Sequence, residues 1–258
     1  MADGGVTERG GPQLIPRPEL WTPGRPAPWE HLSASSRAIG LDRVRDVFSG
    51  RVGEPSPVAA AGGTPSAVLV ALYDAPGTSA EDPMVLLTRR SWELRHHRGE
   101  VSFPGGRAEP GESSTSTALR EAREEVDLSP GEVDVLGELD HLSTVTRRAY
   151  IAPVVGTLPG VPTLHPSDAE VAAILHVPLS ELTADGVFRE ERWGSGEIAR
   201  PVYFFDLYGD TVWGATAAML RQMLVLLLDL DPGPPEDHDP ARNVDWWPLP
   251  PGLTDGAF

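Results

Sequence analysis

The stretch from 94 to 128 limits what this chain can fold into more than any other part of it. It reads "LRHHRGEVSFPGGRAEPGESSTSTALREAREEVDL", so basic side chains, paired glycines and closely spaced carboxylates follow one another. Gly105 and Gly106 carry no Cβ atom, which allows a sharp turn and a close approach of the backbone to a ligand. The succession of basic, glycine and acidic residues raises the question of which ligand a glycine turn and an acidic segment could bind together.

The acidic segment "ESSTSTALREAREEV" is predicted to be a helix. A serine at its start, Ser113 or the next, can accept a hydrogen bond from the first turn. Leu119, Ala122 and Val126 recur at helical spacing and form an apolar stripe. The segment therefore has both a start signal and a face to bury.

Three carboxylates lie on this helix at positions i, i+3 and i+4, where helical side chains share a face. They are Glu121, Glu124 and Glu125. A solvated acidic surface is the usual meaning of such a run. The adjacent glycine turn favours a binding site, because a carbonyl oxygen of the turn could join the carboxylates as a ligand. Hard oxygen donors of this kind suit Mg²⁺ or Mn²⁺.

The organisation of the 258 residues indicates one domain with extensions. A Pro/Gly-rich N-terminal extension is predicted over 1–62, a catalytic domain over 63–230, and a Pro-rich C-terminal tail over 231–258. A weak helical segment is predicted around 36–48 in the extension. Within the domain, apolar runs predict strands, two of them paired as a hairpin, a short helix in the second part of 168–182 and a buried helix at 219–230. The strand-like runs are 66–74, 82–91, 133–142, 149–158, the first part of 168–182, and two strands within 200–213.

Composition excludes several classes of protein. A formal charge of −17 argues against general nucleic-acid binding, which needs a basic surface. Arg221 interrupts the most apolar run, 219–230, which is too short to cross a bilayer, so no membrane association is expected. The chain has no cysteine and no apolar leader at its start, and a cytoplasmic location is therefore predicted.

The same window resembles the Nudix box, G-x5-E-x7-R-E-U-x-E-E-x-G-U, in which U is a bulky apolar residue. The match runs from Gly106 to Leu128 and includes every fixed glutamate. Two positions depart from the motif, because Ala122 is small for U and Asp127 replaces the late glycine. Asp tolerates a left-handed backbone better than most residues, so the turn after the helix is expected to survive.

The resemblance implies a Nudix fold, an α+β architecture of the α/β/α sandwich type, with a mixed sheet between helices and the box as loop, helix and loop. It also implies Mg²⁺ or Mn²⁺ as the cofactor. The implied metal ligands are Glu121, Glu125 and Glu124, with the carbonyl oxygen of Gly106 as a further one. Glu112 and Arg120 are implied to brace the loop against the helix. As a simple surface ion pair they would contribute little.

The segment before the box resembles the signature of coenzyme A pyrophosphatases, L-L-T-x-R-S-x3-R-x3-G-x3-F-P-G-G. The matching residues are Leu86, Leu87, Thr88, Arg90, Ser91, Arg95, Gly99, Phe103, Pro104, Gly105 and Gly106. The later segment "WGATAAML" also resembles this subfamily. Coenzyme A carries a 3′-phosphate as well as a diphosphate, and the arginine fork suits phosphate. Arg90 and Arg95 are therefore predicted to bind substrate or brace the loop, whereas Arg89 and Arg98 are interpreted as solvated charge.

The resemblance implies hydrolysis of coenzyme A or acyl-coenzyme A to 3′,5′-ADP and (acyl-)4′-phosphopantetheine. A glutamate should help to deprotonate the attacking water, and Glu124 and Glu170 are the candidates, although a surface glutamate would look the same at 170. Two alternatives stay open: another nucleoside diphosphate derivative as substrate, such as ADP-ribose or a dinucleotide, and a non-catalytic nucleotide-binding module. Trp246 and Trp247 could anchor the tail on the body or at a homodimer interface.

Overall fold

Two β-sheets and the helices around them make up the computed structural model, which describes residues 8–75, 82–144, 148–196, 199–231 and 233–234. The larger sheet comprises β2 (Thr64–Tyr73), β3 (Met84–Arg90), β4 (Val101–Ser102), β5 (Gly105–Arg107), β6 (Asp134–Glu138), β7 (Leu142–Ser143), β8 (Ala149–Thr157) and β9 (Val171–Pro178). The smaller sheet comprises β1 (Trp21–Pro23), β10 (Phe188–Trp193), β11 (Arg200–Leu207) and β12 (Asp210–Trp213). The helices are η1 (Ala34–Arg37), α1 (Leu41–Phe48), α2 (Pro57–Ala60), α3 (Ser114–Val126), η2 (Pro130–Glu132), α4 (Leu179–Thr183) and α5 (Gly214–Leu227).

The larger sheet is mixed. Its main path runs β4-β3-β2-β8-β6, while β9 pairs with β3, β5 with β2, and β7 with β8. The two central strands, β2 and β8, are parallel, and the other pairs are antiparallel. The predicted hairpin of β2 and β3 is confirmed, with Leu72 opposite Val85.

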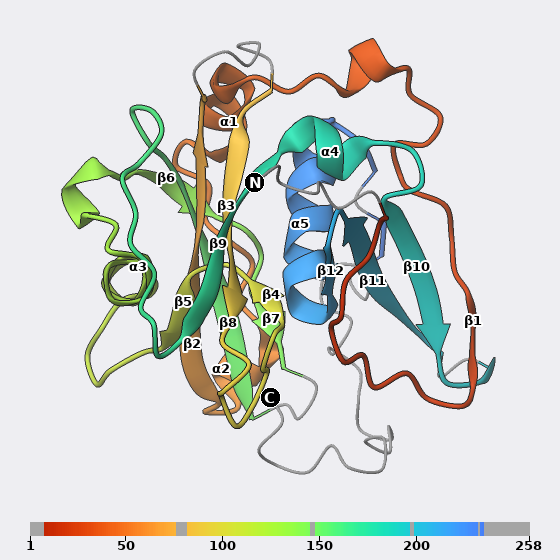
Figure 1. Ribbon diagram of the computed structural model, residues 1–258, viewed down its shortest axis with the longest axis horizontal. Coiled ribbons are helices and arrows are strands. Elements are labelled where there is room, and N and C mark those ends of the chain that lie inside the picture. Colours follow the sequence, from red (N-terminus) through yellow and green to blue (C-terminus); the bar gives the residue numbers. More distant parts are fainter. Residues whose placement is uncertain (1–7, 76–81, 145–147, 197–198, 232, 235–258) are drawn as a thin grey trace, which may run out of the picture.

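Helices cover both faces of the larger sheet, and α5 lies between the two sheets (Figure 1). On one face Ala118, Ala122 and Val126 of α3 pack in a core cluster with sheet residues such as Leu69 and Val154. On the other face α1 and α5 share a larger cluster with the smaller sheet. The predicted α+β class, a mixed sheet between helices, is confirmed.

The predicted helix with the carboxylates is confirmed as α3. Ser113 caps its start, and the Ser113 hydroxyl accepts a hydrogen bond of 3.1 Å from the backbone N–H of Ser116. The helix ends at Asp127, whose φ of 59° is left-handed. The N–H of Asp127 donates to the carbonyl of Arg123 at 3.0 Å. The turn therefore survives without the glycine of the motif, as predicted.

Residues 8–62, here called the N-terminal arm, pack on the body. Trp29, Val44 and Phe48 of the arm are buried in the core cluster that contains α5. Farther toward the start of the chain, β1 pairs with β10, and Arg9 bridges to Tyr208. Arm and body therefore share one hydrophobic core. The domain boundary at residue 62 remains a prediction.

The tail predicted over 231–258 falls mostly outside the described residues, and so do Trp246 and Trp247. Within the described part of the chain, no helix is both long and apolar enough to span a membrane.

Asp127 gives a test of the helix ending. Replacing Asp127 by Gly should leave the free energy of unfolding equal or raise it by up to about 1 kcal/mol, because glycine adopts φ > 0 without steric cost. Replacing it by Val should lower stability by about 1 kcal/mol or more, since a β-branched residue is strained there. Urea denaturation measures both. A glycine variant less stable than the valine variant would contradict the assignment.

Candidate active site

Three elements bring the motif residues together. Arg90 ends β3, Gly105 and Gly106 begin β5, and α3 lies against this strand with Glu121 and Glu125 on its inner side. A Cβ atom on Gly106 would lie 2.6 Å from the carboxylate of Glu121. A Cβ atom there would push the Glu121 carboxylate aside, so glycine at this position lets the carboxylate lie against the box loop.

Glu125 is the most buried of the helix carboxylates, with a side chain that is 4% exposed. The backbone N–H of Gly105 donates to one of its oxygens at 3.3 Å, and Arg90 lies 3.6 Å from the other. Burial raises the pKa of Glu125 to about 7, and the charges of Glu121 and Glu170 add to the rise. Arg90 and the Gly105 amide oppose it. The site holds a carboxylate whose negative charge is only partly compensated.

Glu170 reaches the same place from a distant part of the sequence. It precedes β9, and its carbonyl accepts a hydrogen bond of 2.7 Å from the N–H of Ser91, next to Arg90. The N–H of Ser167 donates to the carbonyl of Glu125 at 2.8 Å. The Glu170 charge acts on both helix carboxylates, because it helps to raise the pKa of Glu121 as well, where burial is the largest cause. The structure therefore brings Glu170 to the box.

Two predicted site residues lie farther out. The side chain of Glu124 is 59% exposed, whereas that of Glu121 is 16% exposed. Arg95 is exposed on the loop between β3 and β4. The structure brings Arg90, Glu121, Glu125 and Glu170 together, and it leaves Glu124 and Arg95 at the edge of this group.

Arg120 connects the box loop to the helix. It donates to both oxygens of Glu112, at 2.8 and 3.1 Å, and to the carbonyl of Arg107 at 3.0 Å. Its other nitrogen contacts Glu121 at 2.8 Å and Glu124 at 3.1 Å. The hydrogen bonds from Arg120, followed by the one from the Glu109 N–H, lower the pKa of Glu112 to about 2. This is the geometry that bracing of the loop requires.

The carboxylates fit a divalent cation by their chemistry. Within the described ranges, no three acidic or histidine side chains already converge on one point. Glu121 and Glu124 contact Arg120, and Glu125 faces Arg90. Burial is the largest cause of the raised pKa values of Glu121 and Glu125, and the charges of neighbouring carboxylates add to it. A hard cation would compensate the charge of these buried carboxylates.

Sequence reasoning misjudged Arg89, which is not a solvated charge. It forms a two-pronged ion pair with the buried Asp210, at 2.7 and 2.6 Å. Gln13 of the N-terminal arm donates to Asp210 at 2.8 Å and to the carbonyl of Gly99 at 3.1 Å. This network ties the loop of Arg95 to the arm and to β12. Nothing in the local sequence signals it, because the partners are far apart in the chain.

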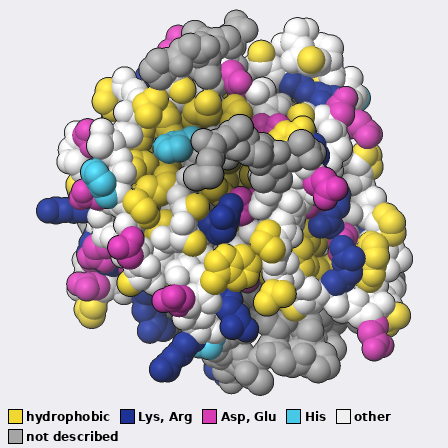
Figure 2. Space-filling model, viewed as in Figure 1, with side chains coloured by type: hydrophobic (Ala, Val, Ile, Leu, Met, Phe, Trp, Pro, Cys, Tyr) yellow, Lys and Arg dark blue, Asp and Glu magenta, His cyan; other side chains and the backbone are white. Residues whose placement is uncertain are grey.

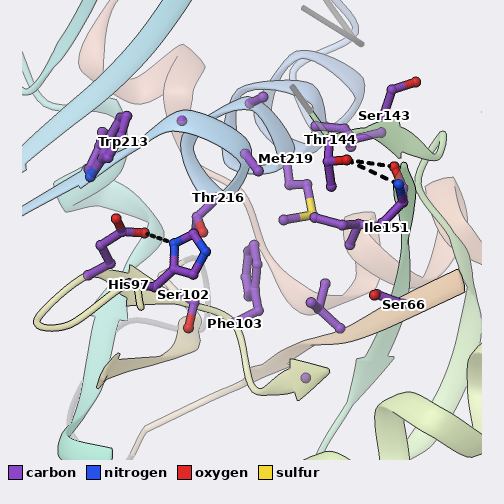
Figure 3. A pocket seen from close by; sticks show the side chains of 18 of the residues that line it. Ser66, His97, Ser102, Phe103, Ser143, Thr144, Ile151, Trp213, Thr216 and Met219 are labelled. Carbon is purple, nitrogen blue, oxygen red and sulfur yellow. Dashed lines mark hydrogen bonds and ion pairs between the residues drawn. The ribbon is translucent and has the colours of Figure 1, made fainter. Parts of the chain in front are cut away.

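A cavity of about 530 Å³ opens beside the box loop. Arg90, Gly105 and Gly106 belong to its wall, which β2, β8, β11 and α5 complete. Figure 3 shows His97 and Trp213 on one side of it, Ile151 and Thr144 on the other, and Phe103 and Met219 between them. On the face shown in Figure 2, acidic and basic side chains are interspersed rather than sorted into a basic surface. This face therefore lacks the basic surface that nucleic-acid binding needs.

Comparison with known proteins identifies the family. A model described as "NUDIX domain" matches residues 63–196. The chain is 42% identical over 142 residues to a protein of Photorhabdus laumondii named "Uncharacterized Nudix hydrolase NudL", covering 55% of this chain and 75% of that one. A protein of the same name from Pectobacterium atrosepticum is 40% identical over 153 residues, covering 57% and 77%.

Solved structures include a MutT/nudix family protein from Enterococcus faecalis, with a TM-score of 0.44 and 18% identity, covering 69% of this chain and 65% of that one. The similarity is too low to support an argument by itself. The sequence matches and the box define a hydrolase class, the enzymes that cleave a diphosphate bond and generally use a divalent metal ion. This chain belongs to the Nudix hydrolase family.

The ion pair of Glu112 gives a pH-dependent prediction. A group with a depressed folded-state pKa stabilises the fold above its unfolded pKa, and the stabilisation is lost as pH falls toward the folded value. Glu112→Gln should therefore destabilise the protein above about pH 4.5, and the difference from the parent should shrink as the pH falls toward 2. Urea denaturation at a series of pH values measures it. Glu132→Gln, on an exposed glutamate, is the matched control; a pH-independent difference for Glu112→Gln would contradict the bracing role.

Proposed function

We propose that this enzyme hydrolyses the diphosphate bond of coenzyme A or acyl-coenzyme A. The attacking water would add to one phosphorus and the bridging P–O bond would break, giving 3′,5′-ADP and (acyl-)4′-phosphopantetheine. The observation that carries the proposal is the meeting of Arg90 and Gly105 with Glu125. It joins the coenzyme A signature to the Nudix box in one site, which a cavity of about 530 Å³ adjoins.

In this proposal Glu121 and Glu125 hold Mg²⁺ or Mn²⁺, with the Gly106 carbonyl and Glu124 as further ligands. A bound divalent ion supplies charge neutralisation at the diphosphate and lowers the pKa of a coordinated water. Arg120 holds Glu121 and the box loop in a fixed relation, and Arg90 offers a guanidinium toward the diphosphate. The Nε of Arg90 is buried and makes no hydrogen bond with any described residue, so it has a donor left for a ligand.

Glu170 is the better candidate for the general base. Its charge acts on Glu121 and Glu125, and backbone hydrogen bonds fix its position beside Arg90. Both side chains are exposed, and Glu124 stays the second candidate because its carboxylate contacts Arg120. Either would accept the proton of the attacking water, a role that accounts for about 10²- to 10⁴-fold in rate.

Other Nudix substrates, such as ADP-ribose or a dinucleotide, are the nearest alternative. One solved neighbour is described as a NUDIX domain of Shewanella oneidensis NrtR complexed with ADP ribose. The basic loop before the box favours coenzyme A, because its 3′-phosphate needs additional positive charge. A homodimer and a cytoplasmic location stay predictions alongside this proposal.

Substituting Glu125 by Gln should lower kcat by about 10²-fold or more, because the substitution removes a charge that faces the reacting group. Mn²⁺ affinity, measured by calorimetry, should fall as well. The metal-free variant should be as stable as the parent or more stable, since a buried ionised carboxylate is costly. Glu132→Gln should change none of these quantities. Near-normal turnover of Glu125→Gln would reject the ligand assignment.

Product analysis on a substrate panel tests the substrate class. The protein should be incubated with Mn²⁺ and coenzyme A, ADP-ribose or diadenosine polyphosphate, and the products separated by chromatography. We expect 3′,5′-ADP from coenzyme A at the highest kcat/KM of the panel. A higher kcat/KM for ADP-ribose would favour the alternative substrate, and metal binding without turnover of any compound would favour a binding module.

A further inference from the structure

We infer that the cavity beside the box receives the acyl chain of an acyl-coenzyme A thioester, and that Met219 helps to set the preferred chain length. The inference rests on the proposed function and deepens it, because it selects thioesters over free coenzyme A. It also assigns a role to the "WGATAAML" segment, which contributes Trp213, Ala215, Ala218 and Met219 to the cavity wall.

The cavity has a charged part and an uncharged part. Its lining residues of the Arg, His, Asp and Glu types are Arg90, His97, Glu100, Arg107 and Arg200. Glu100 is the single carboxylate among the described lining residues, and it is paired with His97 at 2.9 Å. This part suits an anion, and Arg90 connects it to Glu125. A diphosphate bound here would lie next to the box loop.

Much of the remaining wall is apolar and continuous with the protein core, with serine and threonine side chains between the apolar ones. Phe103, Leu142 and Met219 are at most 2% exposed, and all three line the cavity. Val68 and Ile151 pack against the same cluster. Figure 3 shows Met219 directed from α5 toward Phe103 and Ile151. Water held against such a wall gains little, whereas an aliphatic chain would lose its contact with water.

Two hydroxyl groups of the cavity wall are already hydrogen-bonded within the protein. Ser143 bonds Ser56 at 2.8 Å, and Thr144 bonds the carbonyl of Ala149 at 2.9 Å. At these two positions the polar edge of a base would have to displace an existing hydrogen bond, whereas a methylene chain would not.

The volume of the cavity and the side chains that close it limit the length of the acyl chain that fits. A volume of about 530 Å³ lies within the range of about 300–1,000 Å³ that encloses drug-sized ligands. Small residues of α5, Ala215 and Ala218, leave this volume open beside Met219. A larger side chain at 219 would shorten the space, and a smaller one would lengthen it.

The test is a chain-length profile of kcat/KM, from free coenzyme A through acetyl, butyryl, hexanoyl, octanoyl and dodecanoyl thioesters, with Mn²⁺. Complete burial of one methylene corresponds to about fourfold in affinity, part of which is offset by ordering the chain. We expect kcat/KM to rise by at least about tenfold from acetyl to the preferred length. Met219→Ala should move the optimum to longer chains, and Met219→Phe should move it to shorter ones.

Met223→Ala is the matched control. Met223 lies one turn farther along α5 and is equally buried, but it is not among the lining residues of the cavity. The control should lose stability as Met219→Ala does, yet keep the parent chain-length profile. Opposite shifts by the two Met219 variants would not arise from loss of stability alone.

A binding measurement without metal separates the pocket from catalysis. Tryptophan fluorescence in EDTA should report saturable binding of S-octanoyl-4′-phosphopantetheine, because Trp193 and Trp213 line the cavity. Met219→Ala should weaken this binding severalfold and leave that of 3′,5′-ADP unchanged. If kcat/KM did not depend on chain length, or if Met219→Ala weakened the binding of 3′,5′-ADP instead, the assignment of the cavity to the acyl chain would be rejected and the proposed function would stand. Failure of every thioester to yield 3′,5′-ADP would reject the proposed function, and this inference with it.

Discussion

The buried carboxylate of Glu125 is the constraint around which the rest of this enzyme's site is arranged. Taking a carboxylate out of water costs free energy unless neighbouring groups compensate for it. Arg90 and the Gly105 amide do so in part, while Glu121 and Glu170 make the local charge more negative. A site with this balance is destabilising in the free protein, and it favours a cation. The fold therefore keeps a destabilising carboxylate at the place where we propose that the cation binds.

Local signals in the sequence were sufficient for the helix and its loop. Capping by Ser113, the buried stripe of α3 and the sharp turn at Gly106 all depend on residues within a few positions of each other. The expectation that three glutamates share a face was less complete. Successive residues are rotated by about 100° around a helix, so Glu124 points to solvent while Glu125 lies against the sheet. The apolar stripe predicts which face of the helix is buried, but it does not specify which of the three carboxylates beside that face reaches the sheet.

The smaller sheet was only partly predictable, for a related reason. β11 and β12 are apolar and were expected, but β10 contains Glu190 and Glu191, which look like surface residues in the sequence. Both are buried because arginines of the N-terminal arm reach them: Arg25 contacts Glu190 at 3.2 Å, and Arg17 contacts Glu191 at 2.9 Å. A buried glutamate whose arginine partner is far away in the sequence produces no periodic pattern in the residues around it, so its burial cannot be predicted from them. The pairing of Arg89 with Asp210 escaped prediction in the same way.

The closure of the N-terminal arm onto the last strands affects the order in which the chain can assemble. β1 pairs with β10, and Gln13 bonds Asp210, so these contacts join residues that are synthesised first to residues near the other end. Until β10 and β11 have left the ribosome, Trp29 lacks Phe188 and Phe205, the rings against which it packs. Such non-local contacts slow folding, and apolar surface stays exposed until they form. Trp29 of the N-terminal arm therefore stays exposed to solvent until β10 and β11 have been synthesised.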